Sequence, residues 1–389
     1  MSGTRTAAHV VIGAGVIGLA TAWELASRGE DVLVLDPTPG RGASWAAAGM
    51  IAPVSEQVPG EEALAAFTRA SAAMHTDFLA RLVVPGEDAD VDLGRTGTLV
   101  VAVDQADVRE LALTERLLAA EPGRAEQRLT VREARRLEPA LSPRIGAALR
   151  VETDQWLDPR RLASRLMAAL ESRRPGSVVR ERALSVVAAS GGGGDDAGWR
   201  IETTAGEVSA QRTVIVAAAL GTSVLRTPAA PHTPLHAERG DVLRIRPLDR
   251  EDVPGRVIRA FVRGRQTYIV PRADGTVVIG ATVRTDDVSG THVGATLDLL
   301  NDAVEVVPAL RESTLEDITT RDRPATRDHL PVLGVAQSPA GDAMPGLVWA
   351  TGFDRHGVLL APWAARSVAD HVLAGQPFPQ PVNPYRSAS

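Results

Sequence analysis

Four residues near the start of the chain have the types and the spacing needed to bind a phosphorylated cofactor. Gly13, Gly15 and Gly18 form a G-x-G-x-x-G run, and Asp36 follows about twenty residues beyond its centre. In such a run the first glycine permits a tight turn, the second lets a pyrophosphate approach the backbone, and the third lets a helix pack closely on a strand. The acid at this distance can accept hydrogen bonds from ribose hydroxyls.

The elements that would position these residues surround them in the sequence. Apolar residues 9–12 predict a strand before the glycines, residues 32–35 predict a second strand that ends at Asp36, and helical spacing lies between them. The backbone N–H groups of Val16 and Ile17, at the start of that helix, would be free to bind phosphate oxygens. Because the glycines stand in this strand–turn–helix–strand–acid context, we interpret them as a dinucleotide site rather than as an ordinary glycine-rich turn.

The next stretch, GRGASWAAAGMIAP at residues 40–53, favours a flavin over a nicotinamide cofactor. Nicotinamide dehydrogenases usually run from the acid into the next crossover helix. Here small side chains would allow a flat ring to lie against the backbone, and an alanine-rich helix is the alternative interpretation. The expected cofactor contacts in this stretch are Ala43, Ser44, Ala48, Gly49 and Met50.

Composition excludes several classes of protein. The 389 residues are 44% hydrophobic and 23% charged, as in ordinary globular proteins, and the net charge of −6 predicts no nucleic-acid surface. No apolar run reaches the ~18 residues that a membrane span needs. The first residues lead directly into a strand pattern and do not resemble a signal peptide, so we expect a cytoplasmic protein without membrane contact.

Cysteine and lysine are both absent, and all 42 basic residues are arginine. These absences exclude disulfides, thiolate nucleophiles, cysteine-linked flavin and lysine Schiff bases. The arginine bias itself is most simply explained by codon usage. We recognise no zinc or iron pattern among the eight histidines, and we expect no metal.

A second candidate site lies near the end of the chain, in ATGFDRHGVLLAP at residues 350–362. Residues 347–351 predict a strand that enters a glycine turn, and a helix is predicted from residue 357 onward. The N-terminus of this helix would stabilise negative charge on a cofactor held beside it. The contacts expected here are Gly352, Phe353, Asp354, Arg355, His356, Gly357, Val358 and Leu359.

Together, these motifs resemble the FAD-dependent D-amino-acid oxidase family, and within it the glycine oxidase branch that is associated with thiamine synthesis. The resemblance covers most of the chain. It includes the block that begins Y-I-V-P-R at residues 268–272 and R-P-A-T-R-D-H-L-P at residues 323–331. It implies non-covalently bound FAD and a backbone contact from Leu184 to adenine. Members of the branch often form tetramers, so we expect a homo-oligomer.

The resemblance assigns three residues to the substrate. Arg323 stands at the position of the family's carboxylate-binding arginine, and a guanidinium can make two parallel charge-assisted bonds to such a group. Tyr268, one of two tyrosines, stands at the position of the active-site tyrosine that can donate to the same carboxylate. Arg355 is expected to project toward the substrate beside the flavin. A surface ion pair for Arg323 and a core position for Tyr268 are the structural alternatives.

The fold implied by the resemblance is α/β, with a Rossmann-type FAD-binding domain and a second, substrate domain built on a mostly antiparallel sheet. We assign residues 1–85, 145–225 and 325–389 to the FAD domain, and residues 86–144 and 226–324 to the substrate domain. Local patterns predict a helix from Pro159 to about residue 172, a strand over 178–187, a flexible turn at 191–196, and strands over 256–282 joined by a hairpin turn at 273–275.

The implied reaction is oxidative deamination of glycine or a similar small amino acid or amine. Hydride passes from the substrate to FAD, the imine hydrolyses to an oxo acid and ammonia, and dioxygen accepts the electrons to give hydrogen peroxide. D-amino-acid or sarcosine oxidases and dehydrogenases with another electron acceptor are alternatives. A non-catalytic FAD-binding subunit is the alternative from a different class.

Some positions depart from the glycine oxidase pattern and leave the substrate open. The branch usually has G-H-x-R-N-G where this chain has GFDRHG at residues 352–357. Ala219 replaces an expected glycine, Gln266 replaces a common histidine, and residues 320–322 lack the usual aromatic-glycine-leucine entry. We interpret Asp354 and His356 as residues that solvate the turn, with recognition of a larger or more polar amine as the alternative.

Overall fold

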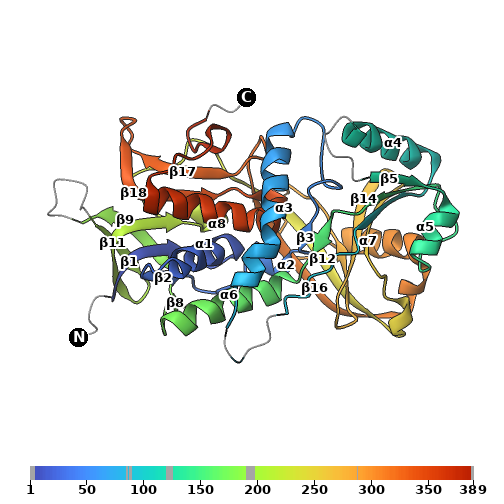
Figure 1. Ribbon diagram of the computed structural model, residues 1–389, viewed down its shortest axis with the longest axis horizontal. Helices are drawn as coiled ribbons and strands as arrows, with labels where there is room; N and C mark the ends of the chain where they lie inside the picture. The colour runs from blue at the N-terminus through green and yellow to red at the C-terminus, as the bar shows by residue number, and fades with distance from the viewer. Residues whose placement is uncertain are drawn as a thin grey trace.

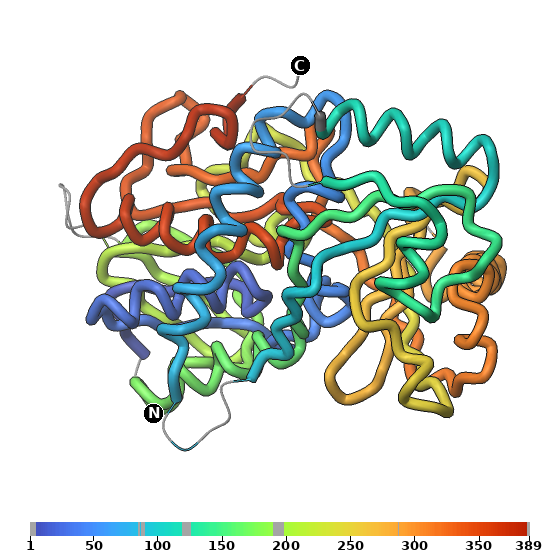
Figure 2. The backbone as a smooth tube through the Cα atoms, turned by 45° about the vertical axis from the view of Figure 1, so that its right-hand side comes forward, coloured from blue at the N-terminus to red at the C-terminus, as the bar shows by residue number. Residues whose placement is uncertain are grey.

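The computed structural model describes residues 5–84, 86, 90–119, 126–189, 198–286 and 288–386. In these ranges two sheets of eight strands each form the two halves of the molecule (Figure 1). Helix α3 (Glu62–Arg81) runs along the middle of the molecule, between the two halves (Figures 1 and 2).

The first sheet has a parallel centre. Its strands are β1 (Arg5–Ile12), β2 (Val32–Leu35), β8 (Val178–Val179), β9 (Ala183–Ala188), β10 (Trp199–Thr203), β11 (Gly206–Val216), β17 (Val332–Gln337) and β18 (Ala343–Thr351). The order is β17-β18-β11-β1-β2-β8, with parallel pairing from β18 to β8 and β10 added antiparallel to β11. The predicted FAD-domain segments therefore meet in one sheet although they are far apart in the sequence.

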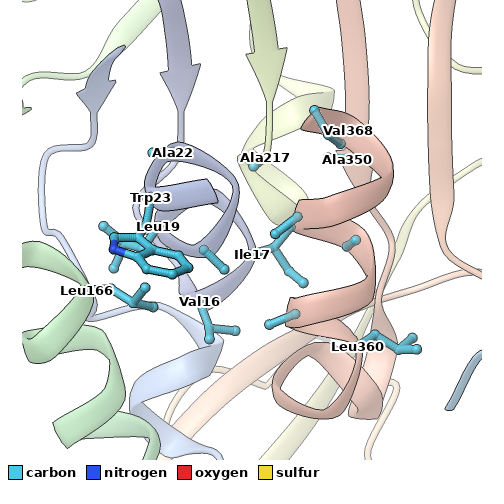
Figure 3. Close-up of a cluster of buried hydrophobic side chains, with 14 of the residues drawn as sticks. Val16, Ile17, Leu19, Ala22, Trp23, Leu166, Ala217, Ala350, Leu360 and Val368 are labelled. Atoms are coloured by element: carbon cyan, nitrogen blue, oxygen red, sulfur yellow. The ribbon is translucent and has the colours of Figure 1, made fainter. Parts of the chain in front are cut away.

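Helices cover one face of this sheet, and a small antiparallel ribbon covers the other. Helices α1 (Val16–Ser27), α6 (Pro159–Arg173) and α8 (Gly357–Ala374) pack with α3 on the first face. Figure 3 shows α1 between the other two, with Trp23 beside Leu166 of α6 and Ile17 directed toward α8. The opposite face packs against β9 and β10 through Val186, Trp199 and Ile201.

The second sheet is mostly antiparallel, as the family resemblance implies. Its strands are β4 (Thr98–Ala102), β5 (Glu126–Leu129), β6 (Ala147–Val151), β12 (His236–Pro247), β13 (Val257–Val262), β14 (Arg265–Pro271), β15 (Val277–Gly280) and β16 (Ser313–Ala325). The order is β16-β12-β15-β14-β13-β4-β6-β5, and only β13 and β4 pair in parallel. β6 belongs to this sheet, although its residues lie within the range 145–225 that was predicted for the FAD domain.

The two faces of the second sheet have different partners. Helix α7 (Val293–Val306) and helix α5 (Val131–Leu137) pack on one face. On the other face, helix α4 (Gln105–Ala119) covers one end of the sheet. The remaining part of that face packs against Ala46, Ala48 and Met50, so the second sheet faces the small-residue segment of the first half.

The predicted start of the helix at Pro159 is confirmed. Asp158 caps α6, because its side chain accepts hydrogen bonds from the backbone N–H groups of Arg160 and Arg161, and Pro159 supplies a fixed φ at the first helical position. The β14–β15 hairpin with its turn at residues 273–275 is also present, and Gly275 has φ +87°.

The single strand predicted over residues 178–187 is wrong. The chain forms β8 beside β2 and then, after residues 180–182, forms β9 beside β10. At Arg182 the chain turns away from β2. The backbone N–H of Arg182 donates to the Thr204 hydroxyl, and its carbonyl oxygen accepts from the Thr204 N–H, which begins the antiparallel ribbon. The turn predicted at residues 191–196 lies outside the described residues.

Several short elements connect the larger ones. Residues 43–53 form one helical turn, α2 (Ala43–Ala46), and a two-residue strand, β3 (Met50–Ile51), which pairs with β7 (Gln155–Trp156). The alternative of an alanine-rich helix therefore holds for a single turn. The 3₁₀ turns are η1 (Ala219–Ser223), η2 (Arg250–Asp252), η3 (Pro308–Arg311), η4 (Asp354–His356) and η5 (Gln380–Val382). Across the described ranges, no helix is both long and apolar enough to cross a membrane.

Candidate active site

The glycine run forms a tight crossing between β1, α1 and β11. Gly13 has φ +107°, and a Cβ at this residue would lie 2.3 Å from the carbonyl oxygen of Ala217. A Cβ at Gly18 would lie 1.9 Å from the carbonyl oxygen of Gly13. Both positions therefore require glycine for packing. Gly15 differs, because an added Cβ would meet only the Ser44 hydroxyl, at 3.5 Å, which leaves room for a ligand near the backbone.

Asp36 at the end of β2 closes the same turn. Its carboxylate accepts hydrogen bonds from the backbone N–H of Ala14 at 2.8 Å and of Thr38 at 2.7 Å. The Ser44 hydroxyl accepts from the Val16 N–H at 3.0 Å, so the expectation of a free Val16 N–H is wrong. The N-cap residue, Gly15, has no side chain that could cap the helix. The start of α1 therefore presents N–H groups and positive dipole toward the space in front of it.

A cavity of about 760 Å³ extends from this turn to the second sheet. It connects the two candidate sites that the sequence identified at opposite ends of the chain. The predicted site residues that line it are Gly13, Gly15, Val16, Ile17, Asp36, Ala43, Ser44, Ala48, Met50, Tyr268, Arg323, Gly352, Phe353, Asp354, Arg355, Gly357 and Val358.

Five predicted cofactor residues lie outside the cavity lining. Gly18 and Gly49 serve close packing, since a Cβ at Gly49 would lie 2.0 Å from the carbonyl oxygen of Leu157. Leu184 lies in β9, and its carbonyl oxygen accepts from the Arg226 N–H at 3.2 Å. The carbonyl oxygen of Leu359 accepts from Ser71 and His75, and the His356 side chain is buried beside Glu56.

The chemistry of this cavity fits FAD. Asp36 can accept from ribose hydroxyls, and the start of α1, with its positive dipole and its open approach at Gly15, suits a pyrophosphate. The small residues of 43–48 leave space for a ring. The start of α8, where Gly357 and Val358 line the cavity, also lacks a side-chain cap. The N-termini of two helices therefore lie at one cavity, and their positive dipole ends suit a cofactor that carries negative charge at two places.

One wall of the cavity is the second sheet, and it carries Tyr268 and Arg323. The Tyr268 ring lies over Gly280, where a Cβ would be 2.6 Å from the phenol oxygen. The Arg323 guanidinium lies over Gly240 and donates from Nη1 to the carbonyl oxygen of Thr282 at 3.2 Å. The side chains of Tyr268 and Arg323 fit on this wall because the residues beneath them, Gly280 and Gly240, have no Cβ.

The protonation states on this wall suit recognition of an anion. Burial raises the pKa of Tyr268, so its hydroxyl stays protonated and can donate a hydrogen bond. Arg323 forms no ion pair with any described residue. A neutral phenol and a guanidinium without an ion pair can together donate hydrogen bonds to a carboxylate.

Arg355 lines the cavity, but its guanidinium is held by acids of the protein. It donates to the carboxylate of Glu61, just before α3, and to Asp354 at 3.3 Å. The predicted approach of Arg355 to the cavity is therefore present, while both ends of its guanidinium fork have partners. Arg323 is better placed than Arg355 to bind an incoming carboxylate.

The interpretation of Asp354 and His356 as residues that solvate the turn is wrong, because both are buried. Asp354 accepts from His329 Nδ1 at 2.8 Å and from Arg355 at 3.3 Å. Burial lowers the pKa of His356 well below its usual value, so this imidazole is neutral. The turn is therefore an internal polar network that fixes the approach to α8.

Sequence reasoning missed several charged residues of the cavity wall, and Glu56 and Arg259 are two of them. Glu56 follows the small-residue segment, and Arg259 lies in β13 between apolar residues. A lone arginine inside an apolar strand was the available signal for the second. Ala217 and Ala218 also line the cavity, together with Ala219, whose φ of +52° explains why glycine is the residue expected at its position.

His232 and His236 stand four residues apart, a spacing that zinc ligands often have on a helix. Pro234 lies between them, and they precede and begin β12 rather than lying on a helix. No group of three His, Cys, Asp or Glu side chains within the described ranges could hold a metal ion.

Several known proteins are similar to this chain in sequence and in structure. A putative thiamine biosynthesis oxidoreductase, ThiO, from Rhizobium etli is 31% identical over 374 residues, which cover 95% of this chain and 98% of that protein. Glycine oxidase from Geobacillus kaustophilus is 29% identical over 385 residues, covering 93% and 92% of the two chains. The crystal structure of glycine oxidase from that organism matches with a TM-score of 0.81 at 25% identity, covering 99% of this chain and 100% of the other.

Other relatives are longer than this chain. The bifunctional protein ThiO/ThiG of Trichormus variabilis is 29% identical over 370 residues, which are 94% of this chain but 52% of that protein. The chain thus spans about half the length of such relatives. The DAO family, described as FAD dependent oxidoreductase, matches residues 9–371. With the cavity, the glycine turn and the two-sheet fold, this match shows that the chain belongs to the DAO family of FAD-dependent oxidoreductases.

Proposed function

We propose that this protein is an amino-acid oxidase of the glycine oxidase type. It would convert glycine or a similar small amino acid or amine, with dioxygen and water, to an oxo acid, ammonia and hydrogen peroxide. The observation that carries this proposal is the pairing of Arg323 and Tyr268 on the cavity wall opposite the small-residue segment. The ThiO and glycine oxidase relatives support the same reaction class.

The residues of the chain would contribute mainly binding and orientation. When bound, FAD supplies the acceptor for the hydrogen that leaves the substrate Cα as hydride. Arg323 and Tyr268 would hold the substrate carboxylate by charge-assisted hydrogen bonds and so fix the direction of its Cα–H bond. Such positioning can lower a barrier by up to about 7–11 kcal/mol.

The charged network at residues 354–356 would shape the same end of the cavity. Glu61 and Asp354 hold Arg355 away from the substrate carboxylate, and the start of α8 favours negative charge on a group in front of it. We also propose that dioxygen is the electron acceptor and that several copies of the chain assemble. The proposal includes a division into two domains, with the boundary after β6 rather than before it.

An anaerobic titration tests the function directly. The purified holoprotein is titrated with glycine while the flavin absorbance is followed, and air is then readmitted with peroxide detection. We expect bleaching followed by recovery with one peroxide per flavin. A flavin that bleaches but does not recover in air would indicate another electron acceptor. A flavin that no amino acid or amine bleaches would contradict the proposal and favour a non-catalytic FAD-binding subunit.

A further inference from the structure

A second arginine lies beside Tyr268 on the cavity wall. Arg259 of β13 is the direct partner of Tyr268 of β14 in their antiparallel ladder. Paired residues in such a ladder direct their side chains to the same face, with Cβ atoms about 5 Å apart. Arg259 and Arg323 therefore approach Tyr268 from opposite sides, and all three residues line the cavity.

The Arg259 guanidinium has one protein partner in the described ranges, the backbone carbonyl oxygen of Ser55, to which Nη1 donates. The residue is half-buried, and no described carboxylate forms an ion pair with it. A half-buried guanidinium with a single carbonyl partner retains several unused donors. An anion in the cavity would satisfy those donors and offset the cost of keeping the charge away from water.

The charges around Tyr268 are unequal. Arg323, Glu56, Arg244 and Arg259 act on its hydroxyl, which gives three positive charges and one negative charge. Arg323, Glu56 and Arg259 line the cavity, and so does Glu238, the ladder partner of Arg323. Arg355 and Asp354 face Glu56 as well, but they are paired with each other. Asp154 is also near Arg259, but it is fully buried and does not line the cavity.

This balance matches a particular class of substrate. A simple amino acid is a zwitterion without net charge, so it would leave one of the two arginines without an anion. An amine with two carboxylates offers one anion to each of the two guanidinium groups and its ammonium group to an acid of the wall such as Glu56. Arg259 could instead serve only to neutralise the carboxylates of Glu56 and Asp154, and the experiment distinguishes this role from binding of substrate.

We propose that Arg259 binds a second acidic group of the substrate, so that the cavity selects amino acids or secondary amines with two carboxylates. The first carboxylate would bind Arg323 and Tyr268, and the second would bind Arg259. This inference rests on the proposed amine oxidation and makes its substrate class more specific. The second carboxylate could be carried on the amine nitrogen or on the side chain, and the experiment distinguishes the two.

The experiment compares two matched pairs of substrates with the wild-type holoprotein. In the first pair, N-(carboxymethyl)glycine is compared with N-methylglycine; in the second, D-aspartate is compared with D-alanine. The rate of anaerobic flavin reduction at low substrate concentration gives a ratio for each pair. We expect the dicarboxylate to be favoured by about tenfold to a hundredfold in at least one pair, as for one charge-assisted contact.

Two variants locate the effect. Arg259→Gln is expected to reduce the favourable ratio to about one, because it removes the charge and the fork. Arg246→Gln is the matched control, since Arg246 is an exposed arginine of β12 that pairs with Glu316 outside the cavity, and it is expected to leave the ratio unchanged. If Arg259→Gln does not fold, the wild-type protein is tested with malonate and acetate as competing ligands, and malonate is expected to bind at least tenfold more tightly.

The outcomes separate this inference from the proposed function. Wild-type ratios near one in both pairs, with N-methylglycine or D-alanine still oxidised, would overturn the role of Arg259 and leave the amine oxidase in place. A favourable ratio that survives in Arg259→Gln would also overturn it. Failure of every amine to reduce the flavin would contradict the proposed function itself.

Discussion

The guanidinium of Arg323 lies directly over the Cα of Gly240, so that a Cβ on Gly240 would be 2.5 Å from Nη2. The atoms in conflict belong to the far end of a flexible side chain, and the backbone of Gly240 is outside the left-handed region. Gly240→Ala should therefore fold normally but displace the guanidinium. We expect KM for the amino acid to rise about tenfold or more, with the FAD content and Tm nearly unchanged. A KM equal to wild type would show that Arg323 does not bind substrate in this position.

Substitution of Arg323 itself tests the fork rather than the charge. Arg323→Lys keeps the positive charge but loses the two parallel hydrogen bonds. We expect kcat/KM for the amino acid to fall by about a hundredfold, equivalent to roughly 3 kcal/mol of binding to the carboxylate. Steady-state peroxide production measures the change, and Arg246→Lys on the outer surface is the control. Equal losses in both variants would point to a general effect of arginine replacement.

Gly13 and Gly29 allow backbone strain to be compared with steric clash when glycine is replaced by alanine. Gly13 and Gly29 both have positive φ, +107° and +95°, but a Cβ at Gly29 would meet nothing within 4 Å. Gly29→Ala should cost about 1–2 kcal/mol of stability and keep FAD. Gly13→Ala should also separate β1 from β11 and lose most of the cofactor. The ratio of flavin to protein absorbance measures the FAD content of each variant, and Tm measures its stability. Retention of FAD by Gly13→Ala would contradict the close packing of Gly13 on Ala217.

Replacement of Ala219 by glycine is expected to stabilise the protein. It adopts φ +52°, which is strained for alanine, whereas the preceding Ala218 has φ −84°. Ala219→Gly should raise the free energy of unfolding by about 1 kcal/mol and Tm by about 1 °C. Ala218→Gly should lower stability by about 0.5–1 kcal/mol, because glycine there only adds freedom to the unfolded chain. Changes of the same sign in both variants would contradict the assignment.

His75 of α3 gives a prediction for the acid limb of stability. Burial lowers its pKa to about 4, although Nε2 donates a hydrogen bond to the Leu359 carbonyl oxygen. The unfolded chain, with a pKa of about 6.5, binds this proton first, so stability is full above pH 6.5 and falls as the pH drops toward 4. Between pH 7 and pH 4.5 the loss attributable to His75 should be about 2–3 kcal/mol.

His75→Gln should remove this contribution and flatten the acid limb. Asp154 must be kept in both proteins, because burial raises its pKa to about 6. Its contribution to stability is therefore lost as the pH rises from about 4 to 6, whereas the contribution of His75 is gained over the same range. Urea unfolding at several pH values measures the difference between the two chains. His371→Gln, which changes a less buried histidine of α8, is the control. A pH dependence identical to wild type in His75→Gln would reject the assignment.

Local patterns determined much of the cofactor half. The predicted strands at residues 9–12 and 32–35, the helix between them and the capped start of α6 are all present. Each depends on residues less than one supersecondary unit apart, such as a side chain that bonds an N–H two or three residues away. The strand predicted over 178–187 failed for the opposite reason. Its break is set by pairing with β2 on one side and β10 on the other, which are distant in sequence.

The sequence by itself determined that a dinucleotide turn, an acid at the end of the second strand and a glycine-bounded helix start are present. Only the tertiary structure decided which side chains share the cavity wall. Arg259 meets Tyr268 through the register of β13 and β14, and Arg323 reaches Gly240 through the register of β12 and β16. Strand register over such separations is fixed by the packing of whole faces, so no local pattern could show that two arginines flank one tyrosine.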